Sequence, residues 1–314
     1  MTGQVARVVA CGVATVQDGG RPGYARVGIA RSGPLHRERY DVAAALLTGR
    51  YDGRTPTIEL LAGALVIEAD RDTTVVVAGP AHCRLHLDGA RRRAPAHAVL
   101  ALRTGERIEV ERDDRPDAGP VYVAVGGWAP ELVLGSATTD TFGRLGGAVV
   151  GAGYVLGAGP ADDATRVGAF WRPVPPETGP LRVVLAQPPV DGIVDGTWRV
   201  RDVSRSGVRL AAADGSTRPI ASVAAAAAPS RPVVAGTVQC TPGGEVIVLG
   251  PDGGVTGGYP VAGVVATVDL DRLSLLAADT SVRFLASSVE DAVAAYADRQ
   301  VRVRRSFGHP DLAG

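Results

Sequence analysis

Glycine and proline interrupt this sequence at short and even intervals, and this feature constrains the fold more than any other. The 314 residues include 41 glycines and 22 prolines, so that regular structure is broken along the whole chain rather than in one linker. Many short β-type runs separated by Gly/Pro turns favour sandwiches or barrels over alternating β–α–β units. The expected strands are Ala6–Ala10, Ile58–Glu68, Thr74–Ala78, Arg107–Glu111, Val121–Val125, Leu181–Ala186, Thr197–Val203, Glu245–Leu249, Val261–Val268 and Val282–Ala286.

Helical patterns are few. Arg37–Leu47 carries apolar residues at helical spacing, and Asp269–Ala277 is expected to form a short helix after a strand. Ser287–Glu290 has the pattern of a capping box and leads into a helix over Asp291–Arg299. We therefore expect a mainly β protein, a β-rich α+β fold with a few short helices. The expected buried stripe of the last helix consists of Ala292, Val293 and Tyr296.

The length suits two average domains or one large one. A polar, Pro/Gly-containing stretch over Asp113–Pro120 precedes a fresh strand and indicates a boundary. We expect an N-terminal β-rich module over residues 1–115, a second β-barrel module over residues 116–300 and a tail over residues 301–314.

The composition excludes several kinds of chemistry. All 33 basic residues are arginine, and the sequence contains neither lysine nor asparagine. There is therefore no P-loop lysine, no Schiff-base lysine and no biotinylated or lipoylated lysine. The 33 acidic residues balance the arginines to a net charge of zero. Because nucleic-acid binding needs a basic stripe that neutralises phosphates, we expect no nucleic-acid partner.

Three widely spaced cysteines, Cys11, Cys83 and Cys240, argue against a disulfide framework. His82 and His86 flank Cys83, but on a strand they would lie roughly 13 Å apart. That separation is too large for one metal ion, so we expect no metal site. The N-terminus shows no signal pattern and no long apolar segment occurs, which favours a cytoplasmic protein with no membrane partner.

Three segments concentrate polar residues beside sharply bent backbone. The first is Thr15–Tyr24, followed by Arg31–Pro34, and the second is Arg205–Leu210. The third brings Gln239 together with the loop Val255–Pro260. Turn chemistry explains the glycines and prolines but not the Arg, Gln, Asp and Ser around them. Such loops place an arginine fork for a carboxylate, carbamate or phosphate, so together they predict an anion-binding cleft.

These segments, in this order, resemble the C-subunit family of bacterial ATP-dependent 5-oxoprolinase. The family is also described as biotin-dependent carboxyltransferase or allophanate hydrolase subunit 2, and it supplies half of the carboxyltransferase region of urea carboxylase. The resemblance covers nearly the whole chain. The matching residues are Thr15–Gly23, Gly28–Pro34, Glu59, Tyr122–Gly127, Leu134–Ser136, Thr139-Asp140, Arg205–Leu210, Gly236–Gln239, Thr256–Pro260 and Ser287–Ala294.

The resemblance implies a fold with cyclophilin-like β-barrel modules, one of them over residues 116–300. It also implies pairing with a homologue of the B-type subunit of 5-oxoprolinase and, in that enzyme, with an A-type subunit of the LamB/YcsF kind. The complete enzyme couples ATP hydrolysis to opening of 5-oxoproline to L-glutamate, so ATP is expected to act through the assembled complex.

Two alternatives stay open. In the urea-carboxylase relatives, the module would move a carboxyl group from carboxybiotin to urea or a related amide. Other relatives act as non-catalytic partners that modulate a sporulation kinase inhibitor. Departures from the family pattern bear on this choice, because they remove polar groups near one cleft. They are at His36, Ala44, Ala81, Arg231, Gly254 and Val261.

The resemblance and the polar segments together nominate site residues. Arg21, Arg205 and Arg209 are expected to hold an anion, and Glu59 is expected to act in acid/base chemistry or to position an arginine. The expected catalytic residues are Asp18, Glu59 and Arg205. The expected substrate- or anion-binding residues are Gln17, Arg21, Ser32, Gly33, Arg209, Gln239, Thr256 and Tyr259.

Overall fold

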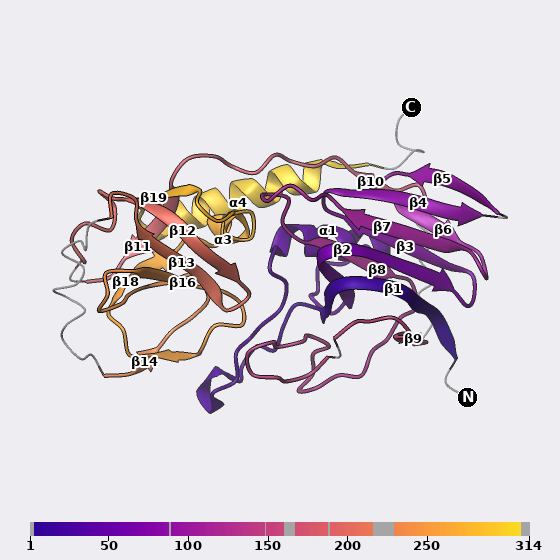
Figure 1. The fold of residues 1–314 in the computed structure, drawn as a ribbon, viewed down its shortest axis with the longest axis horizontal. Helices are drawn as coiled ribbons and strands as arrows, with labels where there is room; N and C mark the ends of the chain where they lie inside the picture. Colours follow the sequence, from indigo (N-terminus) through magenta and orange to yellow (C-terminus); the bar gives the residue numbers. More distant parts are fainter. Residues whose placement is uncertain are drawn as a thin grey trace.

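Two β-rich modules lie side by side in the computed structural model of the protein (Figure 1). The structure describes residues 3–87, 89–147, 149–159, 167–187, 189–215 and 229–308. One module is a wide sheet and the other is a closed barrel. The expected mainly β fold with barrel architecture and few helices is confirmed.

A nine-stranded sheet forms the first module. Its central path runs β5-β4-β7-β2-β8-β3-β6, and β1 pairs with both β2 and β9. Because side chains alternate across a strand, Val75 and Val77 enter one core while Val76 and Ala78 enter another on the opposite face. The strands are β1 (Gln4–Gln17), β2 (Thr57–Ala69), β3 (Thr73–Ala78), β4 (Ala81–Leu87), β5 (Ala90–Ala94), β6 (Val99–Leu102), β7 (Arg107–Arg112), β8 (Val121–Val125) and β9 (Val155–Gly157).

Helix α1 (Arg37–Thr48) packs on the second of these cores. Its buried Tyr40 meets Tyr122 of β8 edge to face, with ring centroids 6.2 Å apart. The helix ends at Gly49, whose φ of 74° lies in the left-handed region that glycine adopts at helix ends. The expected helix over Arg37–Leu47 is confirmed.

A seven-stranded barrel forms the second module. Its order is β11-β18-β15-β16-β13-β12-β19, and it closes through a parallel pairing of β19 with β11. Trp198, Val200, Val238 and Phe284 are among the side chains that fill it. The strands are β11 (Leu181–Leu185), β12 (Thr197–Ser204), β13 (Gly207–Ala212), β15 (Thr237–Cys240), β16 (Val246–Leu249), β18 (Val261–Val265) and β19 (Ser281–Ala286).

Short elements complete the fold. Helix α3 (Thr267–Leu273) follows β18, and α4 (Val289–Arg305) runs from the barrel back toward the sheet (Figure 1). None of the helices that the structure describes is long and apolar enough to cross a membrane. The remaining elements are η1 (Ala25–Val27) and two small strand pairs, β10 (Phe170–Trp171) with β20 (Phe307–Gly308) and β14 (Arg231–Pro232) with β17 (Thr256–Gly257).

The change of module comes later in the chain than expected. Val121–Val125, which we assigned to the second module, is β8 and lies inside the first sheet between β2 and β3. Strand β9 also belongs to that sheet, so the expected boundary at Asp113–Pro120 is wrong and the change falls between β9 and β11. The reason is long-range pairing: β8 is buried throughout and bonds to strands far earlier in the sequence, which a local change of composition does not reveal.

Two expectations for the C-terminal region are also wrong. Residues 301–305 continue α4 and residues 307–308 form β20, whereas we expected a tail; residues 309–314 lie outside the described residues. The expected buried stripe of α4 is largely exposed, since Val293 is 63% and Tyr296 37% accessible. Only Val303 of this helix is fully buried among the described residues.

A buried ion-pair network joins the two modules. Arg205, in the turn between β12 and β13, pairs with Glu59 of β2 and with Asp252, which follows β16. Its Nε and Nη2 donate to the two carboxylate oxygens of Asp252 at 2.8 and 2.9 Å. Glu59 also accepts the hydroxyl of Tyr122 at 2.6 Å. Because all three charged side chains are almost completely buried, the network fixes one module against the other.

Removal of the Arg205 charge should destabilise the protein strongly. Arg205→Met leaves two buried carboxylates without their cation, which should lower the free energy of unfolding by about 3–5 kcal/mol. Arg209→Met is the matched control, because that side chain is 55% exposed and stands 3.9 Å from Glu245; its effect should stay within about 0.5 kcal/mol. Urea denaturation of both variants measures the difference, and equally small losses would contradict the role of the network.

Candidate functional site

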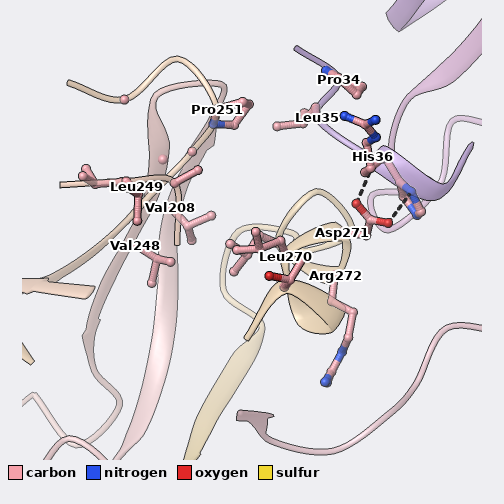
Figure 2. A pocket seen from close by; sticks show the side chains of 18 of the residues that line it. Pro34, Leu35, His36, Val208, Val248, Leu249, Pro251, Leu270, Asp271 and Arg272 are labelled. Atoms are coloured by element: carbon pink, nitrogen blue, oxygen red, sulfur yellow. Dashed lines mark hydrogen bonds and ion pairs between the residues drawn. The ribbon is translucent and has the colours of Figure 1, made fainter. Parts of the chain in front are cut away.

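A cavity of about 560 Å³ lies between the two modules. Its volume falls within the range of about 300–1,000 Å³ that is typical of small-molecule sites. Figure 2 shows Pro34–His36 of the first module on one side and barrel residues Val208, Leu249 and Pro251 on the other. Leu270 of α3 lies between them. The barrel side is mostly apolar, and polar groups gather on the side of the first module.

Ser32 lines the cavity and combines a strained backbone with a buried hydroxyl. Its φ of 53° lies in the left-handed region, and Gly33 follows with φ 98°. The residue is 7% exposed, and its Oγ has no hydrogen-bond partner among the described residues. Strained backbone and unsatisfied buried groups concentrate at functional sites. Of the residues nominated from the sequence, Ser32 is the one that lines the cavity within the described chain.

The glycine-rich motif supports the loop that carries Ser32. The backbone N–H of Arg21 donates to the carbonyl of Arg31 at 2.7 Å. Gly20 packs so closely that a Cβ added there would lie 2.6 Å from the same carbonyl oxygen, and its φ is 86°. The approach therefore requires glycine at this position.

Two network residues also hold this loop. Glu59 accepts the backbone N–H of Leu35 at 2.8 Å, and Nη2 of Arg205 donates to the carbonyl of Gly33 at 2.6 Å. Both side chains are already satisfied by partners inside the protein. Glu59 and Arg205 thus position the loop beside Ser32, and the arginine-positioning role expected for Glu59 is the one that its contacts support.

Most arginines that line the cavity are neutralised by carboxylates. Arg31 differs, because it is exposed and has no ion-pair partner in the part of the chain that the structure describes. Its Nε donates to the carbonyl of Gly19 at 3.3 Å, and its charge acts on the Asp41 carboxyl without a direct ion pair. The cavity therefore offers, next to Ser32, one arginine without a direct ion pair in the described chain. The neutralised pairs are Arg37 with Asp41, Arg299 with Glu38 and Arg272 with Asp269.

His36 and Asp271 form a titratable pair across the junction (Figure 2). The carboxylate of Asp271 accepts the backbone N–H groups of Arg37 and Glu38 at 2.6 and 2.9 Å, so it caps α1 from α3. Its Oδ2 lies 3.4 Å from Nδ1 of His36. Burial raises the pKa of Asp271 to about 6. Burial and two nearby arginines hold the pKa of His36 well below its ordinary 6.5, so the imidazole is neutral at neutral pH.

Asp18 and Arg21 fasten the irregular segment between β8 and β9. Asp18 accepts the hydroxyls of Ser136 and Thr138 at 2.5 and 2.8 Å. Arg21 is 1% exposed and donates to the carbonyls of Val133, at 3.1 Å, and Thr138. Burial lowers the pKa of its guanidinium, although the nearby acidic residues oppose this effect. These contacts fasten the segment, and neither residue lines the cavity in the described chain, although Nη1 of Arg21 is buried without a partner there.

Gln17 is buried at the end of β1. Its Nε2 donates to the hydroxyl of Thr15 and to the carbonyl of Thr139, both at 3.0 Å. The sequence placed Gln17 in a loop, whereas it is the last residue of a long strand. It therefore tethers the same irregular segment as Asp18.

Four nominated barrel residues lie outside the cavity, whose described lining includes none of them. Arg209 extends into solvent near Glu245. Gln239 is buried beneath β17, where a Cβ added to Gly257 would lie 2.1 Å from its Nε2. Thr256 and Tyr259 are exposed, the latter by 43%. Of the third polar segment, Val255 lines the cavity, whereas its nominated polar residues lie outside it.

Sequence reasoning gave no role to three residues of the cavity. Arg31 stands inside a motif that we singled out, and its position next to Ser32 was the available signal. His36 was noted as a departure from the family pattern. Asp271 gave no signal, because its contact with α1 depends on how distant modules pack. Of the other departures, Gly254 lines the cavity, whereas Ala44, Ala81, Arg231 and Val261 lie elsewhere.

The raised pKa of Asp271 predicts a pH-dependent stability. The folded protein holds this proton more tightly than the unfolded chain, so the stabilisation is complete below about pH 4 and is lost as the pH rises through about 6. Relative to Asp271→Asn, the wild type should lose up to about 3 kcal/mol of unfolding free energy across that window. Urea denaturation of both proteins between about pH 4 and pH 7.5 measures this. Parallel pH profiles would contradict it.

Comparisons with known proteins agree with this architecture. Residues 27–286 match the family model of the carboxyltransferase domain, subdomains A and B. The chain is 28% identical over 304 residues to the C-type subunit of 5-oxoprolinase from Escherichia coli (strain K12), and the match covers 91% of this chain and 92% of that relative.

Solved structures show the same fold. The crystal structure of TTHA0988 superposes with a TM-score of 0.74 at 28% identity and covers 90% of this chain, which spans 55% of that longer chain. The urea carboxylase of Kluyveromyces lactis superposes with a TM-score of 0.77 over 100% of this chain and 30% of its own length, at 18% identity. The expected family resemblance is confirmed. Since the family match spans most of the chain, this protein belongs to the carboxyltransferase-domain family that has subdomains A and B.

Proposed function

We propose that this chain is the C-type subunit of an ATP-dependent 5-oxoprolinase, which opens 5-oxoproline to L-glutamate. The observation that carries the proposal is the identity of 28% to the C-type subunit of a 5-oxoprolinase over 91% of this chain. The cavity supports it independently, because an apolar wall, the buried Ser32 and an arginine without a direct ion pair in the described chain meet there.

The chemistry of 5-oxoproline fits these three features. The molecule carries one carboxylate, one lactam and an apolar ring edge. In our proposal, Arg31 binds the carboxylate through a charge-assisted hydrogen bond. The hydroxyl of Ser32 donates to the lactam oxygen, and the ring methylenes pack on Val208 and Leu249. A hydrogen bond from the Ser32 hydroxyl to the ligand would also satisfy one of the buried donors that have no partner within the described residues.

Opening of a lactam requires activation, because amide resonance makes its carbonyl a poor electrophile. Negative charge develops on the lactam oxygen as water adds to the carbonyl carbon. A donor that is already in place stabilises this charge without reorganisation. The contacts of Arg205 with Gly33 and of Glu59 with Leu35 hold the loop that carries Ser32 before substrate arrives, so this chain contributes binding and orientation.

The triphosphate of ATP does not fit the charge of this cavity. A triphosphate carries several negative charges, whereas Arg31 is the one lining arginine without a carboxylate partner in the described chain. Asp271 and Glu177 add acidic groups to the same lining. We therefore place the ATP site outside this chain, in one of the partner proteins of the complex.

The proposed enzyme also needs a homologue of the B-type subunit of 5-oxoprolinase and an A-type subunit of the LamB/YcsF kind. The length of TTHA0988 supports a companion module, since this chain spans 55% of that protein.

A second candidate is transfer of a carboxyl group from carboxybiotin to urea or a related amide. The family match, a carboxyltransferase domain, favours it. The Arg31 guanidinium suits the carboxylate of carboxybiotin as well as that of 5-oxoproline. The cavity therefore does not distinguish the two candidate reactions, and an assay with each substrate does.

Loss of the Arg31 charge should weaken 5-oxoproline binding in the assembled enzyme. Arg31→Ala removes one charge-assisted hydrogen bond, worth about 1.5–3 kcal/mol, so KM for 5-oxoproline should rise about 10- to 100-fold. KM for ATP should stay unchanged. The measurement is 5-oxoproline-dependent ATP hydrolysis, with glutamate release, by the chain co-expressed with both partner subunits.

Arg26→Ala is the matched control, because Arg26 is an exposed arginine of the neighbouring η1 that does not line the cavity in the described chain. An unchanged KM in Arg31→Ala would contradict the assignment of this cavity. A stable complex that releases no glutamate would contradict the 5-oxoprolinase proposal itself, and carboxyl transfer from carboxybiotin by that complex would establish the second candidate.

A further inference from the structure

Helix α4 carries an apolar ridge that nothing in the described chain covers. Val289, Val293 and Val301 are 56%, 63% and 46% exposed, and Ala297 between them is also exposed. These residues follow one another at intervals of four, which on an α-helix forms a continuous ridge. Val303, about 120° around the helix from Ala297, is the buried residue of α4 in the described chain.

The ridge is symmetric about its centre. Val293 and Val301 each stand four residues from Ala297, so an antiparallel copy of α4 that crosses at Ala297 places valine opposite valine at these two positions. Val289, at the end of the ridge, lies opposite Arg305. The small side chain at the centre allows two helix backbones to approach closely. Such self-complementarity is what a twofold interface between identical chains requires.

The charges of α4 have the same symmetry. Its first turn is acidic, with Glu290 and Asp291, and its last turn is basic, with Arg302, Arg304 and Arg305. An antiparallel copy brings the acidic end of one helix to the basic end of the other, at both ends of the contact. Neither Glu290 nor Arg305 forms an ion pair within the described residues, so both charges are available to a partner.

We propose that two copies of this chain associate through antiparallel α4 helices that cross at Ala297. A second copy explains both the apolar ridge and its charge distribution, whereas a partner of other sequence would share this symmetry only by coincidence. A helix of 17 residues is about 25 Å long, so this contact alone covers less than the roughly 800 Å² per partner of a standard interface. The dimer should therefore form reversibly and depend on protein concentration.

Sedimentation equilibrium of the isolated chain tests the association. The wild type should shift from monomer to dimer with increasing concentration, and Val293→Asp should weaken dimerisation at least about tenfold, because it places a charge in the apolar contact. Val13→Asp is the control, since Val13 is 58% exposed on β1, away from α4. A wild type that stays monomeric throughout, or equal effects of the two substitutions, would overturn the proposal.

Cysteine cross-linking tests the twofold axis. Ala297→Cys should form a disulfide-linked dimer under mild oxidation, because the two copies of residue 297 meet at the axis. Asp298→Cys, about 100° further around the helix, should form much less. Cross-linking of equal yield at both positions would overturn the antiparallel geometry.

Charge exchange provides a third measurement. Glu290→Arg should weaken the dimer, and adding Arg305→Glu to the same chain should restore it. Failure of the double variant to recover would contradict the pairing of the helix ends. These results concern α4 alone, so they are independent of 5-oxoproline turnover by the assembled enzyme.

Discussion

The buried pairing of Arg205 with Glu59 and Asp252 is the interaction on which the rest of the structure depends. Buried charges are stable only when each is paired and hydrogen-bonded, and this network meets that condition with contributions from both modules. It also reaches the loop that lines the cavity, through the carbonyl of Gly33 and the backbone N–H of Leu35. The same charged side chains that hold the sheet against the barrel therefore also hold the loop that carries Ser32. The cavity therefore forms where the Arg205 network holds the two modules together.

The charge of the cavity limits its ligands more sharply than its volume does. A volume of about 560 Å³ would admit many small molecules. Three of the lining arginines are neutralised by carboxylates, which leaves Arg31 as the lining arginine without a direct ion pair in the described chain. One such cation beside a buried hydroxyl suits a small monocarboxylate with a second polar group. In our proposal that ligand is 5-oxoproline, and ATP, which several positive charges would have to hold, binds to a partner protein.

Local sequence patterns predicted the fold class, helix α1 and the approximate positions of most barrel strands, because turn residues and apolar periodicity act over short distances. These local patterns gave wrong predictions where contacts between residues distant in the sequence determine the structure. Strand β8 joins the first sheet through distant strands, and α4 exposes Val293 because no neighbouring element in the described chain reaches that side. The site shows the same division: the motif around Ser32 was visible in the sequence, and the contact of Asp271 with α1 was not, since it exists only after the modules dock.

A crystal structure of the assembled enzyme with 5-oxoproline tests the central claim most directly. The account predicts the ligand in the cavity between sheet and barrel, with its carboxylate on the guanidinium of Arg31 and its lactam oxygen within hydrogen-bond distance of the hydroxyl of Ser32. A ligand bound wholly to a partner protein, or in this chain without contact to either residue, would contradict it.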